Sequence, residues 1–276
     1  MIKGTFEGER SLFKTTNETI DASLFQNGES PLKECKGLKV LNSTFLYKYP
    51  LWYGKDITCF NSYFLLDAHA GFWYGVNYDF SSCYFGANKS FRRNSNLTLK
   101  NSIMLNSSEA FWFCSDLLIK NTYINGDYAF LGSKNIILEN VFIKGNYPFD
   151  SSCNVTLKNC ILLSKDAFWN CKSISVYDSV INGEYIGWNS TSLNFFSCKI
   201  FSHQGFCYID KLFIKDSNLY GGDLMFEYCS NIDIEANSKI KSVKNPISGK
   251  IISKGIEELI QDDLSLDKNK VIYEQI

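Results

Sequence analysis

The stretch LKNCILLSKDAFWNCKS, residues 157–173, decides the fold, because the chain repeats its pattern many times. An alternating apolar pair that ends at Leu157 leads into Asn, a small residue and another apolar residue, and after a polar link come Phe, Trp and Cys. The same order recurs in LKNSIMLNSSEAFWFCS (99–115), IKNTYINGDYAFLGSK (119–134) and VYDSVINGEYIGWNST (176–191). A repeat of nearly constant length predicts a solenoid in which each unit packs on its neighbours.

The repeat has a period of 19–21 residues, and its units begin near residues 18, 38, 57, 78, 97, 117, 136, 155, 174, 193, 212 and 232. Each unit opens with alternating apolar residues such as Leu97 and Leu99, which predicts a short strand with one buried face. A polar residue follows, usually Asn or Asp, and these two residues accept left-handed turn geometry. The pattern predicts an all-β fold, a single-stranded right-handed parallel β-helix of about 12 coils over residues 18–245.

Two other solenoids have repeats of a comparable kind. A left-handed hexapeptide helix would show a six-residue period inside each coil, and the units contain none. A leucine-rich repeat needs its Leu-x-x-Leu-x-Leu motif with a helical return, which the Phe-Trp segments do not supply. The right-handed parallel form therefore remains the prediction.

Both ends of the chain depart from the pattern. Residues 1–17 are expected to form an N-terminal cap or a degenerate coil, since terminal units must cover the core. Residues 246–276 are expected to form a C-terminal cap. Within it, GIEELIQDDL (255–264) has apolar residues at helical spacing and predicts a short amphipathic helix, and VIYEQI predicts a last strand.

The composition excludes several classes of function. The 276 residues carry 28 basic and 29 acidic side chains, and no basic patch suggests nucleic acid or an anionic membrane as a partner. Glu7 and Arg10 interrupt the place where a signal peptide has its apolar stretch. No apolar run approaches the roughly 20 residues of a membrane helix. The ten cysteines are then expected to be reduced, which places the protein in the cytoplasm.

One column of the aligned units contains all five tryptophans, and we call it the tryptophan column. Its members are Lys33, Trp52, Trp73, Arg92, Trp112, Leu131, Asp150, Trp169, Trp188, Cys207 and Glu227. The preceding position is usually core-like, so alternation predicts that the column points outward. One interpretation is a ligand-binding platform of Lys33, Trp52, Trp73, Arg92, Trp112, Asp150, Trp169 and Trp188, in which indoles contact sugar rings. The other is that the column is covered, because monomers avoid large exposed apolar patches.

The link before that column supplies candidate catalytic residues. Glu109, Asp127, Asp166 and Glu184 precede the Phe position, and His69 and His203 lie in the same region. Neighbouring carboxylates raise one another's pKa, and carboxylates two coils apart approach the spacing of inverting glycosidases. Arg92 and Arg93 would bind a uronate carboxylate or act as a base in a lyase. Taken singly, each acidic residue is also well explained as a solvated turn residue.

The cysteines form a column of their own, in which Cys35, Cys114, Cys171 and Cys229 share a position that Ser or Gly fills in other coils. This exchange indicates a small corner residue. Stacked coils would place the thiols in a line instead of the convergent set that a metal needs. We therefore predict no metal and no cofactor.

Several motifs together resemble one known family. They are ESPLKEC (29–35), YPLWYGK (49–55), FRRN (91–94), SKDAFWNC (164–171), GEYIGWNS (183–190), GFCYID (205–210) and VKNPISGKI (243–251). They resemble an uncharacterised bacterial family, domain of unknown function thirty-seven thirty-seven, over nearly the whole chain. The resemblance implies a right-handed β-helix with pectin-lyase-like topology, but no activity and no catalytic residues.

Two functions remain open from the sequence. The first is binding or processing of a uronate-containing oligo- or polysaccharide along the aromatic and arginine-lined face; as an enzyme, the protein would be a polysaccharide lyase or an inverting glycoside hydrolase. The second is a non-enzymatic scaffold that buries the tryptophan column against a protein partner or against a second copy in a homo-oligomer.

Overall fold

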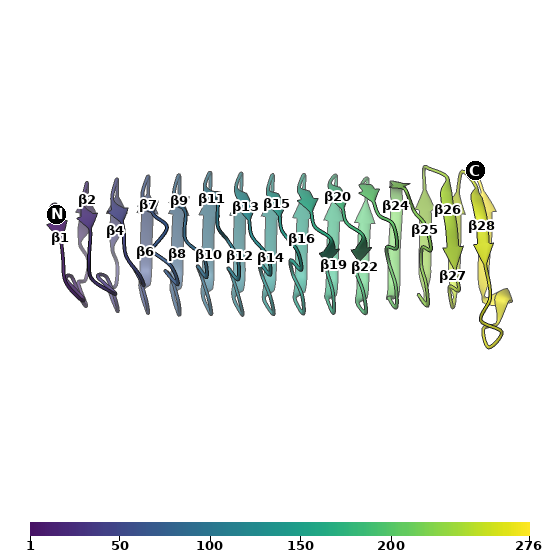
Figure 1. Ribbon diagram of the computed structural model, residues 1–276, viewed down its shortest axis with the longest axis horizontal. Helices are drawn as coiled ribbons and strands as arrows, with labels where there is room; N and C mark the ends of the chain where they lie inside the picture. Colours follow the sequence, from purple (N-terminus) through teal and green to yellow (C-terminus); the bar gives the residue numbers. More distant parts are fainter. The chain divides into compact units, whose positions relative to one another are not determined.

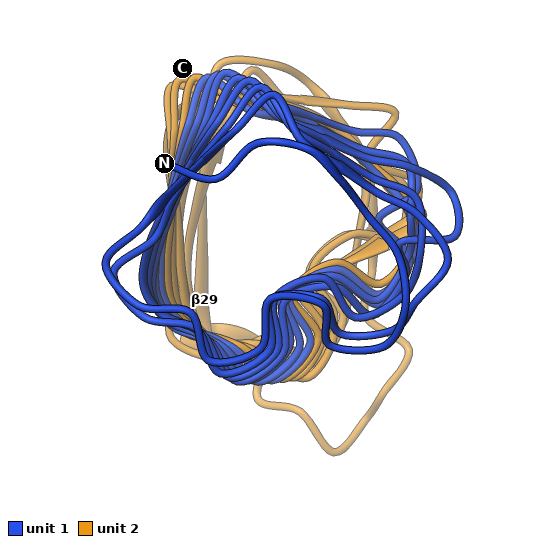
Figure 2. Cartoon of the chain, turned by 90° about the vertical axis from the view of Figure 1, so that its left-hand side faces the viewer, with its two compact units in different colours: residues 1–142 blue, residues 143–276 orange.

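The computed structural model describes residues 1–276 and shows an all-β parallel β-solenoid of about 14 turns (Figure 1). It contains no α-helix, and its one 3₁₀ helix spans Lys268–Lys270. The chain divides into two compact units, Met1–Phe142 and Ile143–Ile276, which Figure 2 distinguishes by colour. The predicted parallel β-helix is confirmed. No helix of the protein is long and apolar enough to cross a bilayer.

The first unit contains fourteen strands. They are β1 (Thr5–Phe6), β2 (Thr19–Asp21), β3 (Leu24–Phe25), β4 (Lys39–Leu41), β5 (Thr44–Phe45), β6 (Lys55–Phe60), β7 (Tyr63–Phe64), β8 (Val76–Ser81), β9 (Tyr84–Phe85), β10 (Ser95–Lys100), β11 (Ile103–Met104), β12 (Ser115–Lys120), β13 (Tyr123–Asn125) and β14 (Lys134–Glu139). Viewed end-on, the coils of this unit overlap closely along the lower wall and spread apart on the right, and the N-terminal coil leaves their path at the top (Figure 2). Strand β15 (Phe142–Lys144) contains the boundary between the units.

The second unit contains the remaining strands. They are β16 (Cys153–Lys158), β17 (Ile161–Leu163), β18 (Asp166–Ala167), β19 (Lys172–Tyr177), β20 (Val180–Asn182), β21 (Tyr185–Ile186), β22 (Thr191–Phe196), β23 (Lys199–Phe201), β24 (Asp210–Tyr220), β25 (Ile232–Ala236), β26 (Ile240–Lys244), β27 (Gly249–Ser253), β28 (Ile256–Ile260) and β29 (Val271–Gln275). Their pairing is parallel, for example β19 with β22 and β25 with β27.

The core consists of apolar side chains that recur at the same place in every coil. In the pair β10–β12, Leu97 lies opposite Leu117 and Leu99 opposite Ile119, and all four are buried. The alternation seen in the sequence therefore separates the core face from the solvent face, as a strand requires. Phenylalanines from the turn segments also stack on each other in the interior, because each of these coils places its phenylalanine directly above that of the coil before.

The polar turn position forms hydrogen-bonded ladders. The Asn121 amide donates to Asn101 Oδ1 at 2.9 Å, and the Asn140 amide donates to Asn121 Oδ1 at 3.1 Å. Asn101 and Asn121 have φ values of 50° and 49°, in the left-handed region that asparagine tolerates. Each asparagine donates toward the preceding coil, so an aspartate can accept from the next coil but cannot donate to the previous one. Asp21 at the turn position accepts from an asparagine one coil later, and Asp56, Asp116, Asp150 and Asp210 do so at other positions of the coil.

The predicted helix over residues 255–264 is wrong. Residues Ile256–Ile260 form strand β28, which pairs in parallel with β26 from Ile240 to Lys244. The exposed edge of β26 offers backbone donors and acceptors that a strand can satisfy and a helix cannot. Apolar residues at 256, 259 and 260 suit either structure, so the sequence pattern alone did not separate the two.

The β-strand pairing also reaches into both predicted caps. Strand β1 pairs with β3, so residues 1–17 contain part of a coil. At the other end, β27 pairs with β25, and β29 pairs with β27. Residues 246–276 therefore continue the sheet that the repeat builds.

Candidate functional site

In the first unit, the indoles of the tryptophan column are half-buried and are fixed by hydrogen bonds to the next coil. Trp73 Nε1 donates to the Lys89 carbonyl at 2.7 Å, and Trp112 Nε1 donates to the Tyr128 carbonyl at 2.7 Å. Trp52 makes the equivalent bond to the Ala70 carbonyl. Because a buried indole N–H needs an acceptor, these bonds hold each ring in one orientation.

The same side chains form one continuous stack. The Trp52 and Trp73 rings lie 5.3 Å apart at 12°, and the Arg92 guanidinium lies 5.1 Å from the Trp73 ring and 4.0 Å from the Trp112 ring. Arg92 takes the place of a tryptophan between two indoles, a favourable cation–π arrangement. The ring faces are therefore directed at each other, and a ligand at the surface would meet their edges.

Arg92 is held by an acidic residue from the following coil. Its Nε donates to the Glu109 carbonyl at 3.1 Å, and its terminal nitrogen is paired with the Glu109 carboxylate. Lys89 lies 3.9 Å from the same carboxylate. The Glu109 amide donates to the Asp127 carbonyl at 2.8 Å, so these two predicted catalytic residues share a position on adjacent coils. The ion pair between Glu109 and Arg92 thus neutralises both charges.

Arg93 differs from its neighbour, because no carboxylate pairs with it. Its guanidinium lies 5.2 Å from the ring of Phe113, whose side chain is 49% exposed. The two arginines lie in a cavity of about 280 Å³, which we call the aromatic–arginine depression. Its lining residues are Trp73, Tyr74, Arg92, Arg93, Trp112 and Phe113. An unpaired cation among aromatic rings suits an anionic ligand with an apolar face.

Lys33 is the remaining cation that the sequence placed in this column. Its amino group lies 5.7 Å from the ring of Tyr53, which stacks on Tyr74 at 4.7 Å and 4°. Lys33 therefore contacts the outer aromatic residues, and it does not line the aromatic–arginine depression.

In the second unit, Trp169 and Trp188 lie 5.9 Å apart with a tilt of 34°, and Trp188 also contacts Tyr208. Trp169 Nε1 donates to the Tyr185 carbonyl at 3.1 Å. Asp150 accepts from the Asn170 amide at 3.0 Å and serves as the first rung of a ladder. This contact gives Asp150 a structural role in the described coils.

The predicted carboxylates of the second unit have different environments. Asp166 is buried, and this burial raises its pKa, partly offset by Lys165 and by a hydrogen bond from Tyr147. Glu184 is more exposed and lies 3.6 Å from the Lys165 amino group. A carboxyl whose pKa is raised by burial is a suitable proton donor. Asp166 does not, however, line the cavity that contains Glu184.

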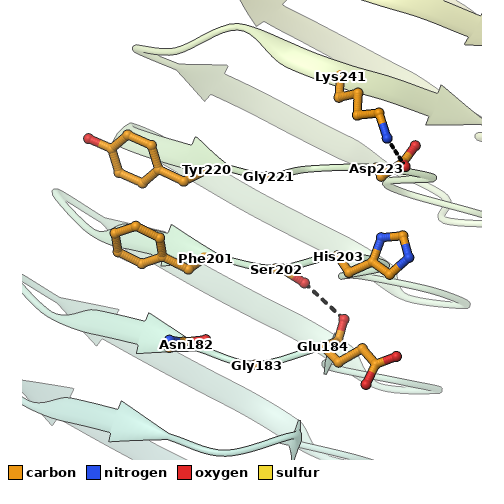
Figure 3. A pocket seen from close by; sticks show the side chains of 10 residues that line it. All are labelled: Asn182, Gly183, Glu184, Phe201, Ser202, His203, Tyr220, Gly221, Asp223 and Lys241. Carbon is orange, nitrogen blue, oxygen red and sulfur yellow. Dashed lines mark hydrogen bonds and ion pairs between the residues drawn. The ribbon is translucent and has the colours of Figure 1, made fainter.

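A larger cavity of about 490 Å³ lies on the second unit, and we call it the acidic groove (Figure 3). Its lining residues are Asn182, Gly183, Glu184, Phe201, Ser202, His203, Tyr220, Gly221, Asp223 and Lys241. Figure 3 shows Asn182, Phe201 and Tyr220 on one side and Glu184, His203 and Asp223 on the other. Lys241 pairs with the Asp223 carboxylate, and Ser242 Oγ donates to it at 2.6 Å; both contacts lower the Asp223 pKa.

The structure brings together part of the predicted set. Trp73, Arg92, Arg93 and Trp112 line one cavity, and Glu184 lines another together with His203. The sequence analysis missed Phe201, Tyr220, Asp223 and Lys241. The period could have found the aromatic pair, because Phe201 and Tyr220 occupy one register position on paired strands. Asp223 and Lys241 lie where the repeat is irregular, and no sequence signal identified them.

Comparison with known proteins gives a family. A family model described as "Protein of unknown function (DUF3737)" matches residues 1–274, and no curated protein matches the chain. Among solved structures, the surface adhesin PfbA of Streptococcus pneumoniae is similar at 13% identity and a TM-score of 0.42, over 76% of this chain and 71% of the adhesin chain.

Two further structures are similar at lower scores. The plasmid-mediated fluoroquinolone resistance protein QnrB1 has 15% identity and a TM-score of 0.31, over 65% of this chain and 86% of its own. The catalytic domain of a GH87 alpha-1,3-glucanase in complex with nigerose has 10% identity and a TM-score of 0.30, over 99% of this chain and 62% of its own. At this level the likenesses concern the β-solenoid fold alone.

Proposed function

The chain belongs to the DUF3737 family of proteins of unknown function, and from the geometry of its aromatic–arginine depression we propose that it binds a uronate-containing oligosaccharide there. The observation that carries the proposal is the unpaired guanidinium of Arg93 over the Phe113 ring. A uronate has a carboxylate for the guanidinium and apolar C–H groups for the exposed part of the Phe113 ring.

The charge around the depression supports an anionic ligand. Of the residues that line the depression, Arg92 and Arg93 are charged. Glu109 neutralises Arg92, so the positive charge of Arg93 remains. The whole chain has a net charge of −1. This local excess of positive charge favours uronates over neutral sugars, and the preference should weaken as salt screens it.

Calorimetric titration with a trigalacturonate and with a neutral galactotriose tests the proposal. We expect the trigalacturonate to bind more tightly, and Arg93→Ala to weaken its binding about tenfold, which is about 1.4 kcal/mol. Arg10→Ala is the matched control, because Arg10 lies 5.6 Å from the Phe13 ring but is already paired with Glu9 at 3.1 Å. Equal affinity for both sugars, or equal losses in both variants, would contradict the proposal.

The exposed aromatic residues of the first unit support the second candidate, a non-enzymatic protein interface. Tyr53, Tyr74 and Phe113 are 46%, 38% and 49% exposed, and they lie beside the half-buried tryptophans. Their combined surface is the type that partners cover. Light scattering on the wild-type chain and on Tyr53→Ser with Tyr74→Ser tests self-association: a wild-type oligomer that the variant loses supports an interface, and a monomer at high concentration removes the homo-oligomer.

A cytoplasmic location remains part of this proposal. It is supported by the ten cysteines, all of which are free thiols in the structure.

A further inference from the structure

The acidic groove of the second unit is built by three successive coils that contribute equivalent segments, 182–184, 201–203 and 220–223. Parallel pairing sets these segments side by side, because Asn182 lies opposite Phe201 and Phe201 lies opposite Tyr220. Hydrogen bonds continue the register past the strands, from the Ser202 amide to the Tyr220 carbonyl at 3.1 Å. The groove therefore runs across the coils with a repeat of about 4.8 Å.

Small residues form the floor of the groove and keep it open (Figure 3). They are Gly183, Ser202 and Gly221. A Cβ atom at Gly183 would lie 2.4 Å from the Ser164 carbonyl oxygen, so the backbone there excludes any larger residue. Ser202 turns its hydroxyl inward to donate to the Glu184 carbonyl at 3.0 Å. The floor is therefore flat backbone without protruding side chains.

One wall of the groove is aromatic. The rings of Phe201 and Tyr220 lie 4.7 Å apart at 20°, and their side chains are 39% and 40% exposed. Asn182 continues the same wall with an amide. An exposed aromatic wall beside a polar one suits a ligand that has both C–H faces and hydroxyl groups.

The opposite wall is polar and carries hydrogen-bonding groups on every coil. The Asp223 amide donates to the His203 carbonyl at 2.9 Å, so these side chains start one coil apart. Lys241 and Ser242 bind different oxygens of Asp223, which leaves each oxygen one lone pair. The imidazole of His203 adds two ring nitrogens that can take part in hydrogen bonds. Carboxylate oxygens on this wall are therefore positioned to accept sugar hydroxyls.

We propose that the acidic groove is a second carbohydrate site, which takes a neutral oligosaccharide laid across the three coils. Its charged lining residues are Glu184, Asp223 and Lys241. Lys241 pairs with Asp223, and Lys165 lies 3.6 Å from Glu184, so the positive and negative charges at the groove balance. A groove without excess positive charge does not favour a uronate over a neutral sugar, whereas the aromatic–arginine depression does. The inference uses different residues from the proposed function, so either can fail alone.

Calorimetric titration with four neutral glucose tetrasaccharides of different linkage tests the groove. We expect at least one of them to bind, and Phe201→Ala with Tyr220→Ala to weaken that binding about tenfold. The matched control is Tyr177→Ala with Phe196→Ala, a pair stacked at 4.9 Å and 5° in the same unit outside the groove. Binding of none of the four sugars, or an equal loss in both variants, would overturn the inference.

Charge gives a second measurement that separates the two sites. Glu184→Gln keeps the side-chain shape and removes one negative charge, so it should narrow the difference in affinity between the neutral tetrasaccharide and its uronate counterpart. Arg93→Ala should leave binding of the neutral sugar within twofold of wild type. If Arg93→Ala instead abolishes neutral-sugar binding, the sugar occupies the aromatic–arginine depression, and the acidic groove is not the site.

Discussion

Two phenylalanines on either side of Trp112 show how a single position in the coil decides the role of a side chain. Phe111 is fully buried between Phe91 at 5.3 Å and Phe130 at 4.7 Å, whereas Phe113 is 49% exposed beneath Arg93. Both have left-handed backbone geometry, with φ values of 59° and 54°. Because the two residues have the same backbone conformation, replacing each by alanine compares the loss of a buried ring with the loss of an exposed ring.

We expect Phe111→Ala to lower the free energy of unfolding by about 3–5 kcal/mol, because it removes a buried ring and leaves a cavity. Phe113→Ala, with the same change in a solvated place, should cost about 0.5 kcal/mol or less. Urea denaturation followed by circular dichroism measures both. Similar losses in the two variants would mean that the core does not lie where the structure has it.

At the scale of the element, the amide ladders have a direction, and this direction restricts where a charge can sit. Asn121 is a middle rung that donates to Asn101 and accepts from Asn140, whereas Asp116 is a first rung that only accepts, from Asn135 at 2.8 Å. Asparagine and aspartate have nearly the same shape, so exchanging them tests the hydrogen bonds without altering packing.

Asn121→Asp should lower the free energy of unfolding by about 0.5–1.5 kcal/mol, since the donor to Asn101 is lost and two acceptors then face each other. Asp116→Asn should be close to neutral at pH 7, because the new amide can still accept from Asn135. Chemical denaturation of both variants measures the difference. A neutral Asn121→Asp would show that the ladder contributes nothing to stability.

The first-rung carboxylates also predict an acid dependence. The Asn135 amide lowers the Asp116 pKa, and the Asn231 amide lowers the Asp210 pKa. A lowered pKa in the folded state stabilises the fold above the unfolded pKa, near 4, and this contribution disappears as the pH falls through the folded value. The urea midpoint should therefore drop between pH 5 and pH 3, and Asp116→Asn with Asp210→Asn should reduce that drop. An unchanged pH profile in the double variant would contradict this.

The sequence predicted the elements well where one position has one role in every coil. Leu97 and Leu117 recur with the period and are buried in register, so the strands and the core followed from the pattern. The pattern failed at Ile256–Ile260, where the structure depends on a sheet edge that only the folded chain provides.

The candidate sites were predictable only in part. The period aligned Trp73, Arg92 and Trp112, but it could not show that their faces stack on each other and leave Arg93 as the unpaired cation. The acidic groove depends on small residues at its floor and on Asp223, which lies outside the regular spacing. Sites of this kind arise where one coil differs in sequence from its neighbours, and a pattern built from what the coils share does not show such differences.

At the scale of the whole molecule, the buried cysteines predict a simple chemical property. Nine of the ten thiols are buried, and only Cys153 is partly exposed. Burial raises the pKa of Cys114 to about 12, so little of its reactive thiolate exists at pH 8. Titration of the native protein with a thiol-specific disulfide reagent at pH 8 should therefore label about one thiol quickly, and all ten after denaturation. Rapid labelling of several native thiols would contradict the burial of these nine cysteines.

The ladders and stacked rings have a consequence for how such a gene can change length. A single inserted residue inside a coil would shift every later amide and ring in that coil off its partner above and below. Gain or loss of a complete turn would instead keep the register of all the other coils. We therefore expect natural length variants of this protein to differ by multiples of about 19 codons, with other insertions confined to the corner loops, where they leave the vertical alignment untouched.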